Sequence, residues 1–130
     1  MAGVKDARKT LRAHALKHPG AWEDHPWDED VAKVANKVFV FFGREGPDLF
    51  VGVKLDRSLL FARAQAFVTK FGYGLDASGW VAARFSPGAT VPIELLRSWI
   101  DESYATVAAA AASIKRTRKR ARPKSAARRR

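Results

Sequence analysis

The charges of this 130-residue chain are divided unequally between two parts. Residues 115–130 hold 10 of the 24 Lys and Arg and none of the 13 Asp and Glu, which gives them a net charge of +10. Residues 1–114 hold the other 14 bases and all 13 acids, a net charge of +1, and the two parts sum to +11. A block of like charges repels itself and stays hydrated. The sequence therefore predicts one folded domain over residues 1–114 and a disordered basic tail over residues 115–130.

The body is rich enough in apolar residues to form one core. The chain is 47% hydrophobic with 8 Phe and 4 Trp, and its length suits a single domain. It has no run of 18 apolar residues, and its first nine residues lack the apolar stretch of a secretory signal. It has no cysteine, which excludes disulfides, thiolate nucleophiles and cysteine-based zinc sites. We expect a cytoplasmic protein with no membrane association.

The first half of the body predicts a helix and a hairpin. Apolar residues spaced three and four apart indicate a helix over residues 4–17, which Pro19-Gly20 ends. Residues 37–42 are β-branched and aromatic and predict a central strand covered on both faces. After a turn-forming segment, residues 49–55 alternate in the manner of a half-buried strand. Residues 21–35 between the helix and the first strand show no clear pattern.

The second half predicts two more helices and one strand. Asp56 is a suitable N-cap for a helix over residues 57–67, with Leu60, Ala64 and Phe67 facing inward.

A strand over residues 80–85 follows Gly79, and Pro92 stands where the last helix would begin, with Pro123 as its latest end. The apolar stripe of this last helix repeats every 3.6 residues and consists of Ile93, Leu96, Ile100, Ser103 and Tyr104, Val107, Ala111 and Ile114. The element order favours an α+β fold in which an antiparallel sheet is packed by helices on one face.

Five groups of short motifs occur in order through roughly residues 5–107. They are Pro19-Gly20-Ala21-Trp22-Glu23 with Pro26-Trp27, Lys33-Val34 with Lys37-Val38-Phe39, Val53-Lys54-Leu55-Asp56, Tyr73 with Gly79-Trp80-Val81, and Asp101-Glu102-Ser103-Tyr104. In their order and spacing they resemble the MmcQ/YjbR family.

The resemblance implies a two-layer α-β sandwich of the CyaY (frataxin-like) type. It also implies DNA binding, a role the family is given because its hairpins resemble paired wings, and it brings no catalytic residues. Members commonly carry a basic pair just before the Gly-Trp step, where this chain has Ala77 and Ser78. If that pair contacts phosphate in relatives, this body lacks the contact, and the basic tail is a candidate to replace it.

The tail is the strongest candidate for binding nucleic acid. Basic segments bind polyanions by releasing condensed counterions, which gives affinity that falls with salt and carries little sequence information. Arg also suits bidentate phosphate contacts. A membrane surface is a poorer partner because no large apolar residue accompanies the charges. The predicted contact residues are Lys115, Arg116, Arg118, Lys119, Arg120, Arg122, Lys124, Arg128, Arg129 and Arg130.

Four residues of the body could add to this interface. Lys37, Lys54 and Arg84 lie on or beside predicted strands and could form a basic face, although solvated bases on an open sheet face are common. Trp80 could stack on bases, although large aromatic residues more often belong to cores.

No metal or cofactor is predicted. The acidic cluster at Glu23–Asp30 offers oxygen ligands but lacks regular ligand spacing, so a solvated patch or a docking site for the tail is the better interpretation. His14 and His18 are four residues apart, but Ala15 stands where a zincin has its Glu, and we expect ordinary surface histidines.

The sequence predicts a binding protein and not an enzyme. No serine has an evident base and orienting group, and no glycine-rich phosphate loop is present. The favoured function is DNA binding, largely without sequence preference, through the tail, in the cytoplasm and in association with the nucleoid. The alternatives are a protein-interaction or regulatory module that uses the sheet face around Lys54 and Trp80, and a metal-linked, frataxin-like role through the acidic cluster.

Overall fold

A computed structural model describes the backbone of residues 3–72 and 74–128, and the side chains of these residues up to residue 113. The elements in chain order are α1 (Val4–Leu16), β1 (Trp22–Asp24), the 3-10 turn η1 (Pro26–Asp28), β2 (Asp30–Val34), β3 (Lys37–Gly43), β4 (Leu49–Lys54), α2 (Leu59–Arg63), β5 (Val68–Lys70), the 3-10 turn η2 (Leu75–Ser78), β6 (Trp80–Phe85) and α3 (Ile93–Arg128). Among the described residues, no helix combines the length and the apolarity needed to cross a membrane.

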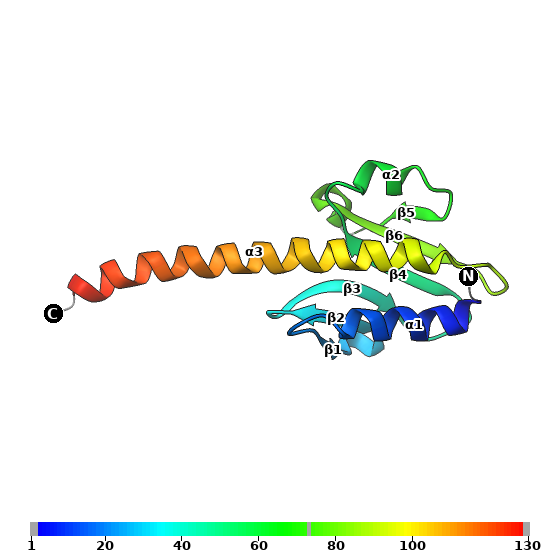
Figure 1. The fold of residues 1–130 in the computed structure, drawn as a ribbon, viewed down its shortest axis with the longest axis horizontal. Coiled ribbons are helices and arrows are strands. Elements are labelled where there is room, and N and C mark those ends of the chain that lie inside the picture. The colour runs from blue at the N-terminus through cyan, green and yellow to red at the C-terminus, as the bar shows by residue number, and fades with distance from the viewer. Residues whose placement is uncertain (1–2, 73, 129–130) are drawn as a thin grey trace.

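The strands form one antiparallel sheet in the order β1-β2-β3-β4-β6-β5 (Figure 1). The predicted hairpin is confirmed by β3 and β4, which pair Val40 with Val53 and Phe41 with Gly52. β6 pairs with β4 along its whole length, although α2 and β5 separate the two strands in the sequence. The sheet therefore has β1 and β5 at its edges and β2, β3, β4 and β6 in its interior.

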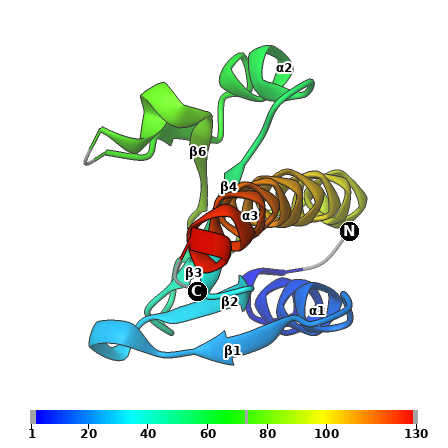
Figure 2. The same cartoon turned by 90° about the vertical axis from the view of Figure 1, so that its left-hand side faces the viewer.

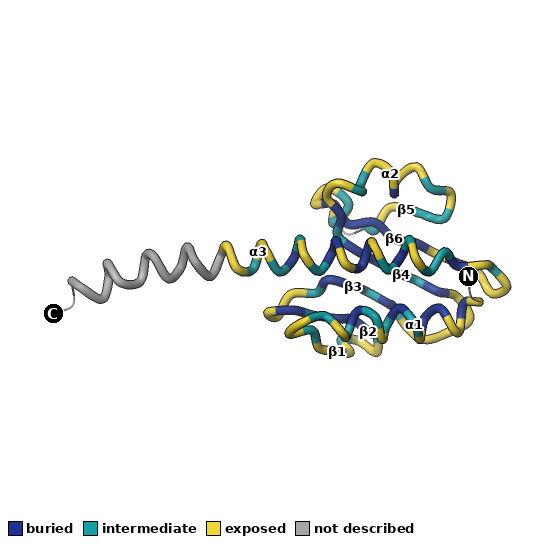
Figure 3. The backbone as a smooth tube through the Cα atoms, viewed as in Figure 1, coloured by how far each residue is buried: buried dark blue, intermediate teal, exposed yellow. Residues whose placement is uncertain are grey.

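Helices α1 and α3 lie on the same face of the sheet and against each other (Figure 2). The core lies between these helices and the sheet, and the predicted stripe of α3 enters it from Ile93 to Val107; Figure 3 shows the buried positions along this helix. Its largest fully buried side chains are Trp99, Phe39, Phe42, Leu11, Leu49, Leu96 and Ile100. The α+β class with helices on one face is confirmed, in an arrangement consistent with a two-layer sandwich.

Three consecutive residues of α3 attach this helix to the chain around it. Ser103 Oγ donates to the Phe39 carbonyl at 2.5 Å and accepts from the Lys54 N–H at 2.9 Å. Tyr104 donates its hydroxyl hydrogen to the Pro19 carbonyl at 2.5 Å. Two residues of the Asp-Glu-Ser-Tyr motif thus hold three separate segments against one helix.

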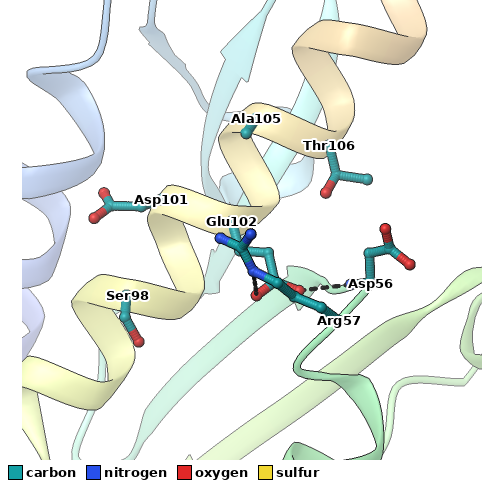
Figure 4. Close-up of a pocket in the computed structure, with 7 residues that line it drawn as sticks. All are labelled: Asp56, Arg57, Ser98, Asp101, Glu102, Ala105 and Thr106. Carbon is teal, nitrogen blue, oxygen red and sulfur yellow. Dashed lines mark hydrogen bonds and ion pairs between the residues drawn. The ribbon is translucent and has the colours of Figure 1, made fainter.

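The third of these residues, Glu102, is a nearly buried carboxylate. It accepts hydrogen bonds from the backbone N–H groups of Asp56 and Ser58, at 2.7 and 3.1 Å, and from the Ser58 hydroxyl at 2.7 Å. Figure 4 shows it pointing to the segment before α2, where Arg57 also approaches it at 3.7 Å. Burial raises the pKa of Glu102, but the hydrogen bonds from Asp56 and Ser58 outweigh it and hold the pKa below its ordinary value.

The face of the sheet opposite α1 and α3, called the open face below, carries an aromatic cluster. Phe71 lies with ring centroids 5.0 Å from Phe41, 5.5 Å from Trp80 and 5.9 Å from Phe50. Gly52 makes this possible because a Cβ there would collide with the Phe71 ring. The segment after β5 thereby covers part of the open face.

Strands β1 and β2 occupy the stretch for which the sequence predicted no element. β2 pairs with β3 across a two-residue turn, Ala35-Asn36, in which both residues have positive φ, +51° and +65°. Such a turn matches the twist of a hairpin and usually contains glycine. Because this turn contains no glycine, its sequence does not indicate a hairpin.

The prediction for α2 is wrong in its length and its cap, and of its three predicted inward residues Phe67 packs against the core whereas Leu60 and Ala64 are exposed. The helix covers five residues instead of residues 57–67, its N-cap is Ser58, and the cap carries no side-chain hydrogen bond. Leu60 is 80% exposed, and Ala62 is the buried residue of the helix. β5, which follows α2, was not predicted.

The boundary between body and tail falls within α3. The helix is assigned as far as Arg128, so the prediction that Pro123 is its latest end is wrong. Ile114 and the tail residues have no described side chains. The division at residue 114 and the disorder of residues 115–130 therefore stay predictions.

Candidate nucleic-acid interface

The ten tail residues predicted to bind nucleic acid lie outside the described side chains. The structure does describe the side chains of α3 that precede this segment, which we call its root. Buried Leu96, Ile100 and Val107 and the bonds of Glu102 and Ser103 fix α3 to the sheet. The basic segment is therefore continuous with a helix that is anchored in the body.

Three of the four predicted body residues meet on the open face. Lys54 is in register with Trp80, and Phe50 is in register with Arg84, so side chains from β4 and β6 project from the same side of the sheet. Lys37 does not join them, because it pairs with Val34, whose side chain belongs to the core beneath the helices.

Within this group, Arg84 is exposed and Trp80 is not. The Arg84 guanidinium lies 4.7 Å from the Phe50 ring centroid, and its Nε donates to Thr69 Oγ1 at 3.3 Å. Trp80 is 8% exposed and packs edge-on to Phe41, 5.2 Å between ring centroids. Its ring therefore has little free surface for a base, in agreement with the alternative of a core residue.

The structure adds Trp22 and Lys33 to the open face. They are in register between β1 and β2, Lys33 Nζ lies 5.2 Å from the Trp22 ring centroid, and Trp22 is 41% exposed. Sequence reasoning missed this pair because it found no strand there. The signal that could have found it was the position of both residues in motifs shared with the resembling family.

Trp27 was also missed and is the most exposed large apolar residue of the described part, at 87%. Trp27 and Asp28 have φ values of +57° and +63°, in the left-handed region that bulky residues rarely adopt. The Glu29 N–H donates to the Pro26 carbonyl at 3.0 Å and closes this turn. Strained backbone that presents a large side chain to solvent is more frequent at functional sites than elsewhere.

The acidic cluster is paired with basic residues of the body. Arg12 binds both carboxylate oxygens of Glu23, which raises the pKa of Arg12. Arg8 lies 2.7 Å from Asp30 Oδ2 and also donates to the carbonyls of Phe42 and Gly43.

The pKa values of Asp24 and Asp30 both lie below the ordinary value. Burial raises the pKa of Asp30, but hydrogen bonds from Arg8 and His25 outweigh it and lower the pKa. A hydrogen bond from Lys33 at 2.7 Å lowers the pKa of Asp24. Three acids of the predicted cluster, Glu23, Asp24 and Asp30, are therefore engaged within the body, and docking of the tail on this cluster stays a prediction.

The prediction of ordinary surface histidines is wrong for His14 and His18. Their side chains are 26% and 15% exposed, and both imidazoles contact Asp101 at the junction of α1 and α3. As predicted, His18 lies past the end of its helix, whose C-cap is Lys17. More than eighty residues separate the histidines from Asp101, so no local spacing could reveal the cluster.

These features define a class of protein: a small α+β domain with an antiparallel sheet, helices on one face, and a basic C-terminal segment. A family model described as YjbR matches residues 16–106, which cover β1 to β6 and α3 as far as residue 106. The chain belongs to the YjbR family, as the resemblance implied. A search of curated proteins found no match to the chain.

Proposed function

We propose that this protein binds nucleic acid, largely without sequence preference, through the basic residues of its C-terminal segment. The observation that carries the proposal is the charge division, +10 over residues 115–130 against +1 over residues 1–114. Ten bases without an acid among them attract phosphate at long range and release counterions on contact. The anchored root of α3 supports the proposal, because a bound segment then holds the whole body on the polymer.

The open face is the second contact surface in this proposal. Lys33 projects from it beside the partly exposed ring of Trp22, and Lys54 and Arg84 project from β4 and β6 on the same face. Cations together with a stacking surface suit single-stranded or unstacked bases. DNA is proposed ahead of RNA on the strength of the family resemblance alone. The proposal places the protein in the cytoplasm, at the nucleoid, and gives it no enzymatic activity.

The test is equilibrium binding of the full-length chain to a random duplex and to the matching single strand at one fixed salt concentration. A variant with all ten tail bases changed to Gln keeps the chain length and should bind at least about a hundredfold more weakly. The matched control changes Lys33, Lys54 and Arg84 to Gln and should lose less duplex affinity than single-strand affinity. Equal affinity of the tail variant and the parent chain would contradict the proposal.

A protein-interaction module is the second candidate function, and Trp27 is the observation that favours it. An 87% exposed Trp on a left-handed turn, next to acidic residues that repel phosphate, suits a protein partner better than DNA. The test is recovery of a defined partner from nuclease-treated lysate. Loss of that partner in Trp27→Ala would place the contact at the turn, and loss in Lys54→Glu but not in Lys37→Glu would place it on the open face.

A metal-linked role through the acidic cluster is a weaker candidate. Glu23, His25 and Asp30 could hold an ion, since their ligand atoms lie within 4.8 Å of one another. Arg12 and Arg8 already occupy the two carboxylates, so a cation would have to displace them. Calorimetry with iron, calcium and zinc tests this role, and the absence of heat in the parent chain would remove it.

A further inference from the structure

Two histidines and an aspartate converge where the end of α1 meets α3. Nε2 of His14 and Nε2 of His18 lie 2.7 and 2.8 Å from the same oxygen of Asp101, Oδ1. Figure 4 shows Asp101 pointing toward α1 and away from its neighbour Glu102. No Lys or Arg pairs with Asp101 among the residues whose side chains are described.

The environment of His18 decides which ring nitrogen carries hydrogen. Its Nδ1 lies 3.0 Å from the carbonyl oxygen of Ala15, which can only accept, so Nδ1 is the donor. In the neutral ring Nε2 is then an acceptor, and it faces a carboxylate oxygen, which is also an acceptor. Nε2 of His18 and Oδ1 of Asp101, 2.8 Å apart, therefore offer two ligand atoms to one cation.

The His18 ring is also held in place from its sides. Its centroid lies 4.5 Å from the Tyr104 ring, 5.9 Å from Phe39 and 5.3 Å from the His14 ring. A backbone carbonyl on Nδ1 together with fixed ring orientation is the usual support of a metal-binding histidine. The Ala15 carbonyl and the neighbouring rings thus orient His18 through contacts of the fold itself.

We propose that His14, His18 and Asp101 bind a divalent transition-metal ion of the zinc class through two Nε2 atoms and one carboxylate oxygen. Imidazole and carboxylate are suitable ligands for zinc, and three protein ligands leave a position for water or an exogenous ligand. Ligand atoms at about 2.0–2.1 Å from a tetrahedral zinc lie about 3.3 Å apart. Asp101 therefore has to withdraw by roughly half an ångström, and its side chain is 54% exposed and free to do so.

The free coordination position faces a groove between α1 and α3. His14 and Asp101 line this groove together with Lys9, Lys17 and Arg97, and Glu94 pairs with Arg97 at 2.7 Å. These cations oppose a second positive charge and favour an anion as the fourth ligand. We therefore expect the affinity of an open, three-ligand site and not that of a closed structural zinc site.

The cluster of Glu23, His25 and Asp30 is a natural comparison because it has the same residue types. Its carboxylates are bound by Arg12 and Arg8, whereas the side chains paired with Asp101 in the described part of the chain are the two histidines. The chain has three histidines in all, so each can be assigned to one of the two clusters.

The experiment titrates the full-length, untagged chain with Zn²⁺ by calorimetry and with Co²⁺ by visible absorption. We expect one equivalent of metal per chain, a Co²⁺ spectrum with imidazole ligands, and a rise in melting temperature on zinc addition, since the ion links α1 to α3. Asp101→Asn keeps the shape of the side chain. This variant and His14→Ala should each lose the heat of zinc binding and the zinc-dependent rise in melting temperature. His25→Ala is the matched control and should retain both.

Absence of heat and of a Co²⁺ spectrum in the folded parent chain would overturn the proposal. Binding that persists in Asp101→Asn and His14→Ala but disappears in His25→Ala would overturn it as well, because the ion would then lie at Glu23 and Asp30. Circular dichroism of each variant separates lost binding from lost folding.

Discussion

The hydroxyl of Ser103 bridges the backbone of β3 and β4 at the point where the two strands separate, accepting from the Lys54 N–H at 2.9 Å. The same hydroxyl donates to the Phe39 carbonyl at 2.5 Å, one residue before the first β3–β4 pair, Val40 with Val53. Ser103 is fully buried. A side chain from α3 thus satisfies two backbone groups that the strand pairing leaves free.

Ser103→Ala should therefore destabilise the protein. Both backbone groups would lose their partner in a site without solvent, and the expected loss in free energy of unfolding is about 2–3 kcal/mol. Ser98→Ala is the control, because Ser98 is exposed on the same helix and its hydroxyl donates only to the Leu95 carbonyl. Urea denaturation checks the difference, and equal midpoints for the two variants would contradict the bridging role.

The protein should also lose stability in acid, through Glu102 and Asp30. Both carboxyls have a pKa below the ordinary values of 4.5 and 3.8, because hydrogen bonds to the charged form outweigh the effect of burial. Their contribution is complete above the unfolded pKa and is lost as pH falls through the folded pKa. The free energy of unfolding should therefore decline from about pH 5 downward.

Glu102→Gln tests the part of this effect that comes from Glu102. The variant should lose about 2 kcal/mol at pH 7, since Asp56 and Ser58 lose a charged acceptor, and its stability should depend less steeply on pH below 5. Denaturant midpoints at a series of pH values give both quantities. A variant that kept the full slope of the parent chain would show that Glu102 does not titrate as described.

Gly52→Ala should destabilise the open face. The added methyl would overlap the Phe71 ring, which has to move out of the cluster with Phe41 and Trp80, at an expected cost of about 1–3 kcal/mol. Gly46→Ala is the control, because its Cβ would meet nothing within 4 Å. Thermal melting of the parent, Gly52→Ala, Phe71→Leu and the double variant tests the cause. If Gly52→Ala costs much less in the Phe71→Leu background, the collision with the Phe71 ring causes the loss of stability.

Much of the fold could be predicted from the sequence where a long pattern repeats. The 3.6-residue stripe of α3 and the alternation over Leu49–Lys54 reflect burial on one face, and the structure has both elements. Patterns failed where the segments are short or irregular. β2 has two register irregularities, near Ala32 and Val31, and its turn to β3 lacks glycine.

The sites were less predictable than the fold, for a physical reason. Contacts such as His18 with Asp101, or Arg8 with Asp30, join residues that only the tertiary structure brings together. The motif Asp-Glu-Ser-Tyr was visible in the sequence, but its role is positional: Glu102, Ser103 and Tyr104 each hold a different segment against α3.

The most direct test of the proposed function is the salt dependence of binding to a random DNA duplex. The account predicts that the logarithm of the association constant of the full chain falls with the logarithm of salt concentration with a slope steeper than about −4, against a limit near about −9 for ten phosphate contacts. The variant with its ten tail bases changed to Gln should keep only the residual affinity of the open face, with a slope no steeper than about −3 for its three cations. Equal slopes for the two proteins would contradict the account and would move the nucleic-acid site to the folded body.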